Sequence, residues 1–330
     1  MKLGITRRGL LASGAALATA PLLGRSASAQ AWKPTKPVRI VCGYPAGGGS
    51  DAMARAFADY LSKQLGQPFV VENKAGASGS VAAIEVKRAP ADGYTLMYTI
   101  STTMILNKVL YKNLQYDPDK DFEPISYVPV PGLPLMASTS TGATNLKEFV
   151  EFAKKNKANV GTYAAGSFAH LCIAEINKFY GLNIEAVNYR GEAPMWTDLA
   201  SGSIHGAIGG SVPAQNIVDT GKGKPVAMLS KKRLKKMPDV PTFIEQGCTA
   251  TFFGLSGYTG MVAPAGLPEA VAETYSKLCF AAGQDPVTWP RMEAAGAEDP
   301  PTTRQEFARL MREEAKVWRE SASALGLTLE

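Results

Sequence analysis

The residues best suited to chemistry are three consecutive glycines, Gly47 to Gly49, which Ser50 and Asp51 follow. A strand-like apolar segment at 38–44 precedes them, and a helix-like segment at 51–65 comes next. A glycine turn between a strand and a helix exposes backbone N–H groups at the helix N-terminus, where the helix dipole attracts an anion. The turn predicts a site for a dinucleotide, a nucleotide phosphate or a small carboxylate, or else a purely structural turn.

A dinucleotide is the first of these alternatives. Residues 47–52 match the pattern G-x-G-x-x-A, and Glu72 ends the next strand-like segment at the spacing of a ribose-binding acid. Residues 44–46 separate the first strand from the glycines, however, whereas the fingerprint places its first glycine at the strand end. A phosphate loop fits less well, because Gly49 stands where its lysine is required. An exported oxidoreductase that binds a dinucleotide at Gly47–Gly49 is therefore the alternative function.

The elements that must position these residues alternate between strand and helix. The first half reads as strand 38–44, helix 51–65 ended by Gly66, strand 69–72, helix 80–89 and strand 94–100. This order predicts βαβ units and a parallel sheet. The second half starts again with helix 146–156, and residues 159–181 are typical of a strand, a small-residue turn and a helix ended by Gly181.

Two such sheets facing each other would direct two helix N-termini at one cleft, because open parallel sheets bind ligands beyond the carboxyl ends of their strands. The two turns contain no lysine or arginine. Backbone amides would then bind the anion together with four hydroxyls, those of Ser50, Ser101, Thr102 and Ser167. That mode favours a carboxylate over a polyphosphate.

The beginning of the chain has the features of a bacterial export signal. Arg7 and Arg8 precede an apolar, alanine-rich run to Leu23, and small residues near Ala29 suit a cleavage site. We expect residues 1–31 to be removed, by the general secretory or the twin-arginine route, leaving a soluble protein in the periplasm. The mature chain then carries 31 basic and 29 acidic residues, which does not indicate a nucleic-acid surface. The dense basic run Lys231–Lys236 is expected to be a solvated loop.

We expect no enzyme activity, no metal site and no cofactor, although acid–base catalysis by carboxylates stays an open alternative; cysteine and histidine usage bears on metal sites and histidine bases. The four cysteines lack any CxxC spacing: Cys42, Cys172, Cys248 and Cys279. We expect buried free thiols at the first two, and a disulfide between the last two stays open. Only His170 and His205 could serve as histidine bases, and no GxSxG elbow is present.

Six stretches of the sequence occur together in a characteristic order: KPVRIVCGYPAGGGSDAMAR, ENKAGASGSVAAIEVKRAPADGYTLMY, GSFAHL, VNYRGEAPMWTDLASG, MPDVPTFIEQG and VAPAGLP. They resemble the extracytoplasmic substrate-binding proteins of tripartite tricarboxylate transporters, the Bug family, over nearly all of the mature chain. The resemblance implies a monomer with the type II periplasmic binding protein fold, an α/β fold of two lobes with a ligand cleft between them. It also implies capture of a small organic mono- or dicarboxylate, aliphatic or aromatic, and delivery to membrane transporter subunits.

The repeated units and the resemblance together predict the domain organisation. Residues 1–31 are the export signal, 32–127 the first part of lobe 1, 128–251 lobe 2, and 252–330 the return to lobe 1 with the C-terminal helices. The two crossings between lobes are expected near 127–134 and 250–257. Thr303 and Glu306 have the spacing of a capping box, which predicts the start of a C-terminal helix.

The resemblance further implies which residues contact the ligand. The expected contacts are Tyr44, Gly47, Gly48, Gly49, Ser50 and Asp51 in the first turn, Ala165, Gly166, Ser167, Phe168 and His170 in the second, and Ser101, Thr102 and Tyr258 beside them. Phe168 and Tyr258 depart from the family pattern, so the distal end of the ligand stays open. Asp51 could instead serve the backbone at its helix start, His170 could have a local role, and both aromatic residues could belong to the core.

Overall fold

The computed structural model describes Met1 and residues 32–326, so the predicted export signal, apart from Met1, lies outside the described residues. Trp32–Glu330 form one compact unit, and the features below belong to it. Within the described part of the chain, no helix combines the length and the apolar character that crossing a membrane requires.

Lobe 1 is built on a five-stranded sheet with the order β2-β1-β3-β10-β4. Its strands are β1 (Val38–Cys42), β2 (Phe69–Asn73), β3 (Thr95–Ile100), β4 (Phe122–Pro129) and β10 (Tyr258–Pro264). β1 is parallel to β2 and β3, but β10 is antiparallel to both β3 and β4. The parallel sheet predicted from the βαβ units of residues 38–100 is confirmed for β1, β2 and β3. β10 is antiparallel because it enters the sheet from the other lobe rather than through a helical crossover.

Lobe 2 is built on a second, separate sheet with the order β7-β6-β8-β5-β9. Its strands are β5 (Leu133–Ser138), β6 (Asn159–Thr162), β7 (Glu185–Asn188), β8 (Gly206–Ile208) and β9 (Gly223–Leu229). The chain passes between the sheets after β4 and again before β10, and the two crossings are joined where the Val130 N–H donates to the Gly257 carbonyl at 2.9 Å. The prediction of two α/β lobes is confirmed.

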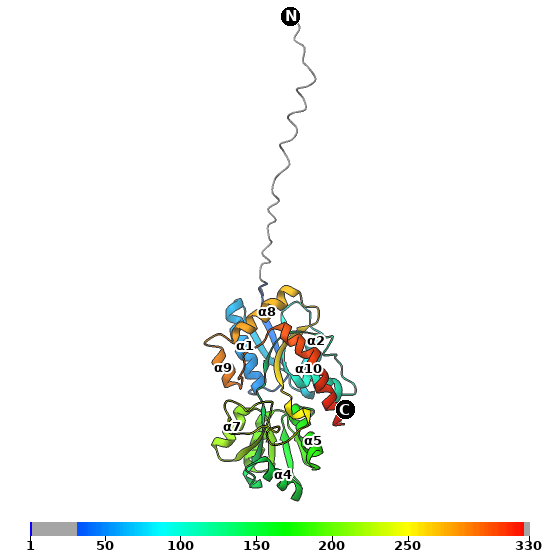
Figure 1. Cartoon of the computed structure of the whole chain (residues 1–330). Coiled ribbons are helices and arrows are strands. Elements are labelled where there is room, and N and C mark those ends of the chain that lie inside the picture. Colours follow the sequence, from blue (N-terminus) through cyan, green and yellow to red (C-terminus); the bar gives the residue numbers. More distant parts are fainter. Residues whose placement is uncertain (2–31, 327–330) are drawn as a thin grey trace. The chain divides into compact units, whose positions relative to one another are not determined.

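Helices cover both faces of each sheet (Figure 1). In lobe 1, α1 (Gly49–Leu65), α8 (Glu269–Ala282) and α9 (Trp289–Ala294) pack on one face. The other face carries α2 (Ser80–Lys87), the π-helical turn η2 (Thr102–Leu106), α3 (Asn107–Leu110) and α10 (Arg304–Ala324). In lobe 2, α4 (Leu146–Lys155) and α5 (Phe168–Tyr180) lie opposite α6 (Glu192–Ser201) and α7 (Ser211–Asp219). The short turns η1 (Ala77–Gly79), η3 (Thr139–Thr141) and η4 (Thr251–Gly254) complete the described elements.

Several helix ends form as their sequences predict. Gly66 ends α1 and Gly181 ends α5, both in the left-handed conformation with φ of 72° and 65°. Thr303 and Glu306 form the capping box of α10. Phe307 and Trp318 of the same helix are buried.

One hydrophobic core extends from lobe 1 into lobe 2. The Phe168 ring of α5 lies 4.6 Å from the Trp318 ring of α10 and 5.0 Å from the Phe252 ring of η4, measured between ring centroids. The C-terminal helix of lobe 1 and the second crossing therefore pack against lobe 2 at the same place.

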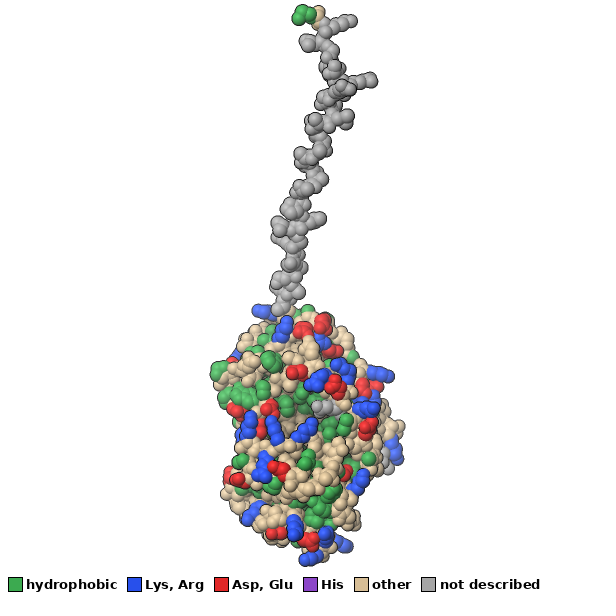
Figure 2. Space-filling view, viewed as in Figure 1, with side chains coloured by type: hydrophobic (Ala, Val, Ile, Leu, Met, Phe, Trp, Pro, Cys, Tyr) green, Lys and Arg blue, Asp and Glu red, His purple; other side chains and the backbone are tan. Residues whose placement is uncertain are grey.

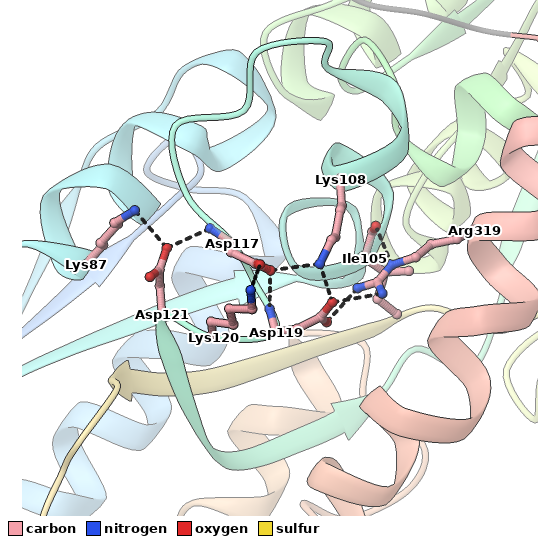
Figure 3. Close-up of polar contacts among 8 residues, drawn as sticks. All are labelled: Lys87, Ile105, Lys108, Asp117, Asp119, Lys120, Asp121 and Arg319. Atoms are coloured by element: carbon pink, nitrogen blue, oxygen red, sulfur yellow. Dashed lines mark hydrogen bonds and ion pairs between the residues drawn. The ribbon is translucent and has the colours of Figure 1, made fainter.

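An ion-pair network connects α10 and two helices of lobe 1 to the segment 117–121 that leads into β4 (Figure 3). Arg319 donates two hydrogen bonds to Asp119, at 2.7 and 3.0 Å. Lys108 donates to the same carboxylate at 2.6 Å, and Lys87 of α2 pairs with Asp121 at 2.9 Å. These contacts hold the loop and the C-terminal helix against η2 and α3.

All four cysteines are buried and free. Cys248 lies in lobe 2, with its Sγ 3.1 Å from the Tyr180 hydroxyl. Cys279 lies on α8 in lobe 1, and its Sγ is 4.0 Å from the Met261 sulfur. The disulfide that the sequence left open is absent, because the two thiols belong to different lobes.

The basic run Lys231–Lys236 is largely exposed, but it also contacts the other lobe, which the expectation of a solvated loop did not include. Lys235 Nζ donates to the Glu298 carbonyl at 3.1 Å, and Lys236 Nζ donates to the Glu293 carbonyl at 2.7 Å. On the face seen in Figure 2, lysine and arginine side chains are interspersed with aspartate and glutamate. That mixed surface agrees with the near-balanced charge of residues 32–330.

Candidate ligand-binding cleft

A cavity of about 590 Å³ lies between the two lobes. Such a volume is within the range of small-molecule sites. It is lined from lobe 1 by residues 44–50, 52–53, 100–101, 128–130, 257–259 and 294–297, and from the first crossing and lobe 2 by residues 131–133, 163, 168, 190–194, 196, 210–213 and 216. Most of these side chains are apolar, and the polar groups concentrate where helices begin.

The first glycine turn meets the cavity at the N-terminus of α1. Gly48 is the N-cap residue and no side chain caps it, so the first N–H groups of the helix face a position where an anion is favoured. Gly47 has a φ of 81°, a conformation that glycine adopts without strain. Gly47, Gly48, Gly49 and Ser50 all line the cavity, as expected from the sequence.

Asp51 is buried behind this turn and does not line the cavity. Its carboxylate accepts from the Gly47 N–H at 3.0 Å, from Asn73 Nδ2 at 2.9 Å and from Arg55 Nε at 3.0 Å. Burial alone would raise the pKa of Asp51, but these hydrogen bonds outweigh it and lower the pKa. Asp51 therefore stabilises the backbone of the turn. This is the second of the two roles that the sequence offered for it, the first being contact with the ligand.

The wall beside the turn is formed by Tyr44 and Ser101. The Tyr44 hydroxyl is directed to Thr103 Oγ1, at 3.2 Å, so its ring is the part that faces the cavity. Ser101 is buried in the cavity wall next to Gly257, where an added Cβ would lie 3.3 Å from the serine hydroxyl. Thr102 does not line the cavity, and its buried hydroxyl has no hydrogen-bond partner among the described residues.

The second small-residue turn does not open onto the cavity in the way that the first does. Ser167 Oγ accepts from the His170 N–H at 3.2 Å and caps α5, while the Gly166 N–H donates to His170 Nδ1 at 3.0 Å. The Ala165 carbonyl accepts from the Ser78 hydroxyl of lobe 1 at 2.5 Å. None of the predicted contacts from Ala165 to Ser167, nor His170, lines the cavity.

The physical reason is that protein side chains already occupy the N-terminus of α5. The Ser167 hydroxyl accepts the His170 N–H within the helix start, and His170 Nδ1 accepts the Gly166 N–H just before it. Burial lowers the pKa of His170, whose Nδ1 is a hydrogen-bond acceptor. The Ser167 hydroxyl and the His170 ring thus take the place that the sequence assigned to an anion.

Phe168 and Tyr258 both line the cavity and are both buried in the core. The sequence offered ligand contact and core packing as alternatives for them, and the structure is compatible with both roles at once. Tyr258 donates its hydroxyl to Met311 Sδ at 3.0 Å and packs on Phe307 with ring centroids 5.0 Å apart. Its ring, rather than its hydroxyl, therefore faces a ligand. Both residues contribute apolar surface.

The sequence analysis missed two further helix N-termini that open onto the cavity, those of α6 and α7. They begin at Gly191–Pro194 and Gly210–Pro213, and no side chain caps either N-cap glycine. Both segments read Gly-x-x-Pro, with proline in the first helical turn where its missing N–H costs nothing. That repeated pattern, GEAP and GSVP, was the signal in the sequence that could have identified them.

Glu192 and Trp196 lie at the α6–α7 end of the cavity. Glu192 Oε1 accepts from the Gly210 N–H at 2.8 Å, so this carboxyl occupies the start of α7. Burial raises the pKa of Glu192, and Gly210 and Trp196 oppose the rise. The other charged side chain that lines the cavity is Arg190, which is exposed.

Histidine side chains and the acid expected of a dinucleotide site lie outside the cavity. Neither histidine lines the cavity, and no group of three His, Cys, Asp or Glu side chains among residues 32–326 is placed to hold a metal ion. Glu72, the acid expected of a dinucleotide site, is paired with Arg39 at 2.8 Å and does not line the cavity. The dinucleotide alternative has no support in this geometry.

Comparison with known proteins gives a family and a set of structural neighbours. The family model described as "Tripartite tricarboxylate transporter family receptor" matches residues 53–327. The structure of the periplasmic binding protein BugD is 30% identical, with a TM-score of 0.81 over 90% of this chain and 100% of BugD.

Two further neighbours were solved with acids. An R. palustris protein with adipate is 28% identical, with a TM-score of 0.83 over 89% of this chain and 99% of the neighbour. MatC from Rhodopseudomonas palustris with bound malate is 27% identical, with a TM-score of 0.77 over 88% of this chain and 99% of MatC.

Proposed function

Because the chain belongs to the tripartite tricarboxylate transporter receptor family, we propose that it captures a small organic carboxylate between its two lobes and delivers it to the membrane subunits of such a transporter. We place the mature protein in the periplasm, in agreement with the export-like beginning of the sequence and with its periplasmic neighbour BugD. In this proposal it acts as a monomer without a cofactor and without catalysing a reaction.

The observation that carries the proposal is the convergence of three helix N-termini, α1, α6 and α7, on one mostly apolar cavity. No side chain caps α1 or α6, so their first backbone N–H groups are available to carboxylate oxygens, whereas at the start of α7 the Glu192 carboxyl already accepts the Gly210 N–H. The apolar walls suit the carbon skeleton of an organic acid. Neighbours that hold adipate and malate support the same class of ligand.

We assign the carboxylate to the α1 turn, where Gly48, Gly49 and Ser50 line the cavity beside the Ser101 hydroxyl. Rings of Tyr44, Phe168 and Tyr258 contact the carbon skeleton. The other residues expected from the sequence have supporting roles in this proposal: they shape the turns or cap helices, namely Gly47, Asp51, Thr102, Ala165, Gly166, Ser167 and His170.

A thermal-shift screen of purified mature protein tests the proposal, followed by calorimetric titration of the acids that raise the melting temperature. The panel contains aliphatic and aromatic mono- and dicarboxylates, with the corresponding amides as uncharged controls. We expect 1:1 binding of at least one acid and none of its amide. Failure of every acid to bind, or a nicotinamide or flavin that copurifies near 1:1, contradicts the proposal.

A further inference from the structure

The turn Gly76–Gly79, between β2 and α2, has an unusual backbone. All four of its residues have positive φ angles, 150° at Gly76, 42° at Ala77, 52° at Ser78 and 85° at Gly79. Glycine adopts such angles without strain, whereas a residue with a Cβ does so at a cost. In the described part of the chain, Ala77 and Ser78 are the only residues other than glycine with positive φ. Strain of this kind persists where neighbouring groups enforce it, and it is concentrated at functional sites.

The side chain of Ser78 gives a reason for the strained backbone. Its hydroxyl donates a hydrogen bond to the Ala165 carbonyl of lobe 2, with the two oxygens 2.5 Å apart. A glycine at position 78 would adopt a φ of 52° without strain, but it would lack the hydroxyl. Neither Ser78 nor Ala165 lines the cavity. The contact therefore joins the two lobes without touching the space for a ligand.

Lobe 1 fixes the position of this donor through buried groups. The Ser78 carbonyl accepts hydrogen bonds from Thr103 Oγ1 at 2.9 Å and from Asn107 Nδ2 at 3.0 Å, and both of these residues are fully buried. It also accepts from the Tyr44 hydroxyl at 3.3 Å, and the Tyr44 ring lines the cavity. All three donors belong to lobe 1, so they hold the Ser78 backbone whether or not lobe 2 is in contact.

Lobe 2 fixes the acceptor in the same way. The Ala164 carbonyl, one residue before the acceptor, receives hydrogen bonds from Thr162 Oγ1 at 3.1 Å and from the Ser167 N–H at 3.2 Å. These groups shape the turn that presents the Ala165 carbonyl to lobe 1. Because each half of the contact is held by its own lobe, few groups need to be ordered when the halves meet.

We propose that Ser78 is an interlobe latch, which stabilises the form in which the lobes touch even before a ligand binds. Water replaces both partners when the lobes separate, so the hydrogen bond favours the closed form by its net contribution alone. The strained conformation is retained because it directs the hydroxyl at lobe 2. The latch does not depend on the proposed function, since neither partner contacts the cavity.

The test measures the distance between the lobes in unliganded protein. Spin labels are attached at Lys63→Cys on α1 and Lys155→Cys on α4, two exposed positions in different lobes. The four native cysteines are buried, so the introduced thiols react selectively. Pulsed electron paramagnetic resonance then gives the distribution of distances. We expect a population at the distance of the structure, and we expect Ser78→Ala to lower its ratio to the open population about three- to tenfold.

Two further variants, made in the same labelled protein, separate the hydroxyl from the strain. Ser78→Gly removes the hydroxyl and relieves the strain, so it should lose the closed population as Ser78→Ala does, but melt about 1–3 °C higher than that variant. Ser201→Ala is the matched control, because the Ser201 hydroxyl is exposed and bonds within lobe 2, to the Asp198 carbonyl and Ser203. It should leave the distances unchanged. Melting curves establish that each variant is folded.

Three results would overturn the latch. The first is an unchanged distance distribution in folded Ser78→Ala. The second is a labelled parent protein without the population that matches the structure. The third is a Ser78→Gly protein that keeps the closed population while Ser78→Ala loses it, because strain and not the hydroxyl would then control the lobes. None of these results bears on whether the cavity binds a carboxylate, which titration of acids tests separately.

Discussion

Gly49 is the residue on which the carboxylate site depends most directly. It is the first residue of α1, and an added Cβ would have its nearest contact at 3.7 Å, with the Ala295 carbonyl. That is an ordinary van der Waals distance, so the fold has space for a side chain there. The same side chain would occupy the approach of the ligand to the helix N–H groups.

We therefore expect Gly49→Val to weaken carboxylate binding by about a hundredfold or more, because it obstructs the helix N-terminus whatever the distal group of the ligand. The melting temperature should change little. Gly79→Ala is the contrasting variant, since its Cβ would lie 2.2 Å from Thr103 Oγ1 at a φ of 85°, and it should lower the melting temperature strongly. A well-folded Gly49→Val protein with full affinity in calorimetric titration would remove this turn from the site.

Ser167 was predicted from the sequence to bind the ligand, but in the structure it caps a helix instead. Its hydroxyl caps α5 by accepting the His170 N–H, and its side chain is fully buried. Ser167→Ala should therefore lower the free energy of unfolding by about 1 kcal/mol and leave the Kd for the ligand unchanged. Denaturant titration and calorimetry measure the two quantities. The pattern of weaker binding at unchanged stability would restore Ser167 to the ligand site.

At the scale of secondary-structure elements, the sequence predicted where helices begin and end better than it predicted which groups bind to those ends. Gly66, Gly181 and the Thr303 capping box acted as their local sequences indicate, because such ends depend on a few neighbouring residues. The hydrogen bond from Ser78 of lobe 1 to the Ala165 carbonyl, just before α5, depends on tertiary packing, which spacing along the chain does not encode.

The antiparallel direction of β10 could not be predicted from the sequence for a related reason. Its sequence is that of a buried strand, and only the crossing before it determines the direction in which it enters the sheet. The Glu192 carboxyl at the start of α7 likewise joins residues 18 positions apart through the packing of two helices. Sequence patterns thus predicted the α1 half of the cavity better than the α6–α7 half.

The C-terminal helix α10 depends on Arg319, which joins it to the segment before β4 (Figure 3). The Arg319 side chain is 23% exposed and makes two hydrogen bonds to Asp119. We expect Arg319→Gln to lower the free energy of unfolding by about 1–2 kcal/mol at pH 7. Arg309→Gln, which removes an exposed pair with Glu313 on the same helix, should cost about 0.5 kcal/mol or less. Equal effects of the two variants in denaturant titration would contradict a special role for Arg319.

The same network should make this difference depend on pH. Hydrogen bonds from Lys108 lower the pKa of Asp117, and for Asp119 those from Arg319 and Lys108 outweigh a burial that alone would raise the pKa. A carboxyl whose pKa is lowered by folding stabilises the fold fully above its unfolded value, about 3.9, and loses that contribution as the pH falls through the folded pKa. The stability gap between wild type and Arg319→Gln should therefore be constant from pH 5 to 7 and shrink below pH 4.

At the scale of the whole binding unit, the two lobes touch at several places around the cavity. Ser78 of lobe 1 donates to the Ala165 carbonyl of lobe 2. An added Cβ on Gly191 of lobe 2 would lie 3.2 Å from Pro45 of lobe 1. On another side, Lys235 and Lys236 donate to the carbonyls of Glu298 and Glu293. A ligand held between the lobes can leave only when such contacts break, so they should govern its rate of dissociation.

Lys236→Gln tests this control, because it removes the 2.7 Å hydrogen bond from Nζ to the Glu293 carbonyl without altering any residue that lines the cavity. We expect the ligand to dissociate about three to ten times faster, with the association rate nearly unchanged, since a hydrogen bond from a charged donor is lost only in the form in which the lobes touch. Lys231→Gln is the matched control: it makes the same change of charge in the same exposed run, and Lys231 forms no ion pair among the described residues. Stopped-flow measurements at two salt concentrations separate the two effects. Long-range attraction of the anionic ligand would appear as an equal, salt-dependent loss of association rate in both variants, and that result would contradict the role of Lys236 in holding the lobes together.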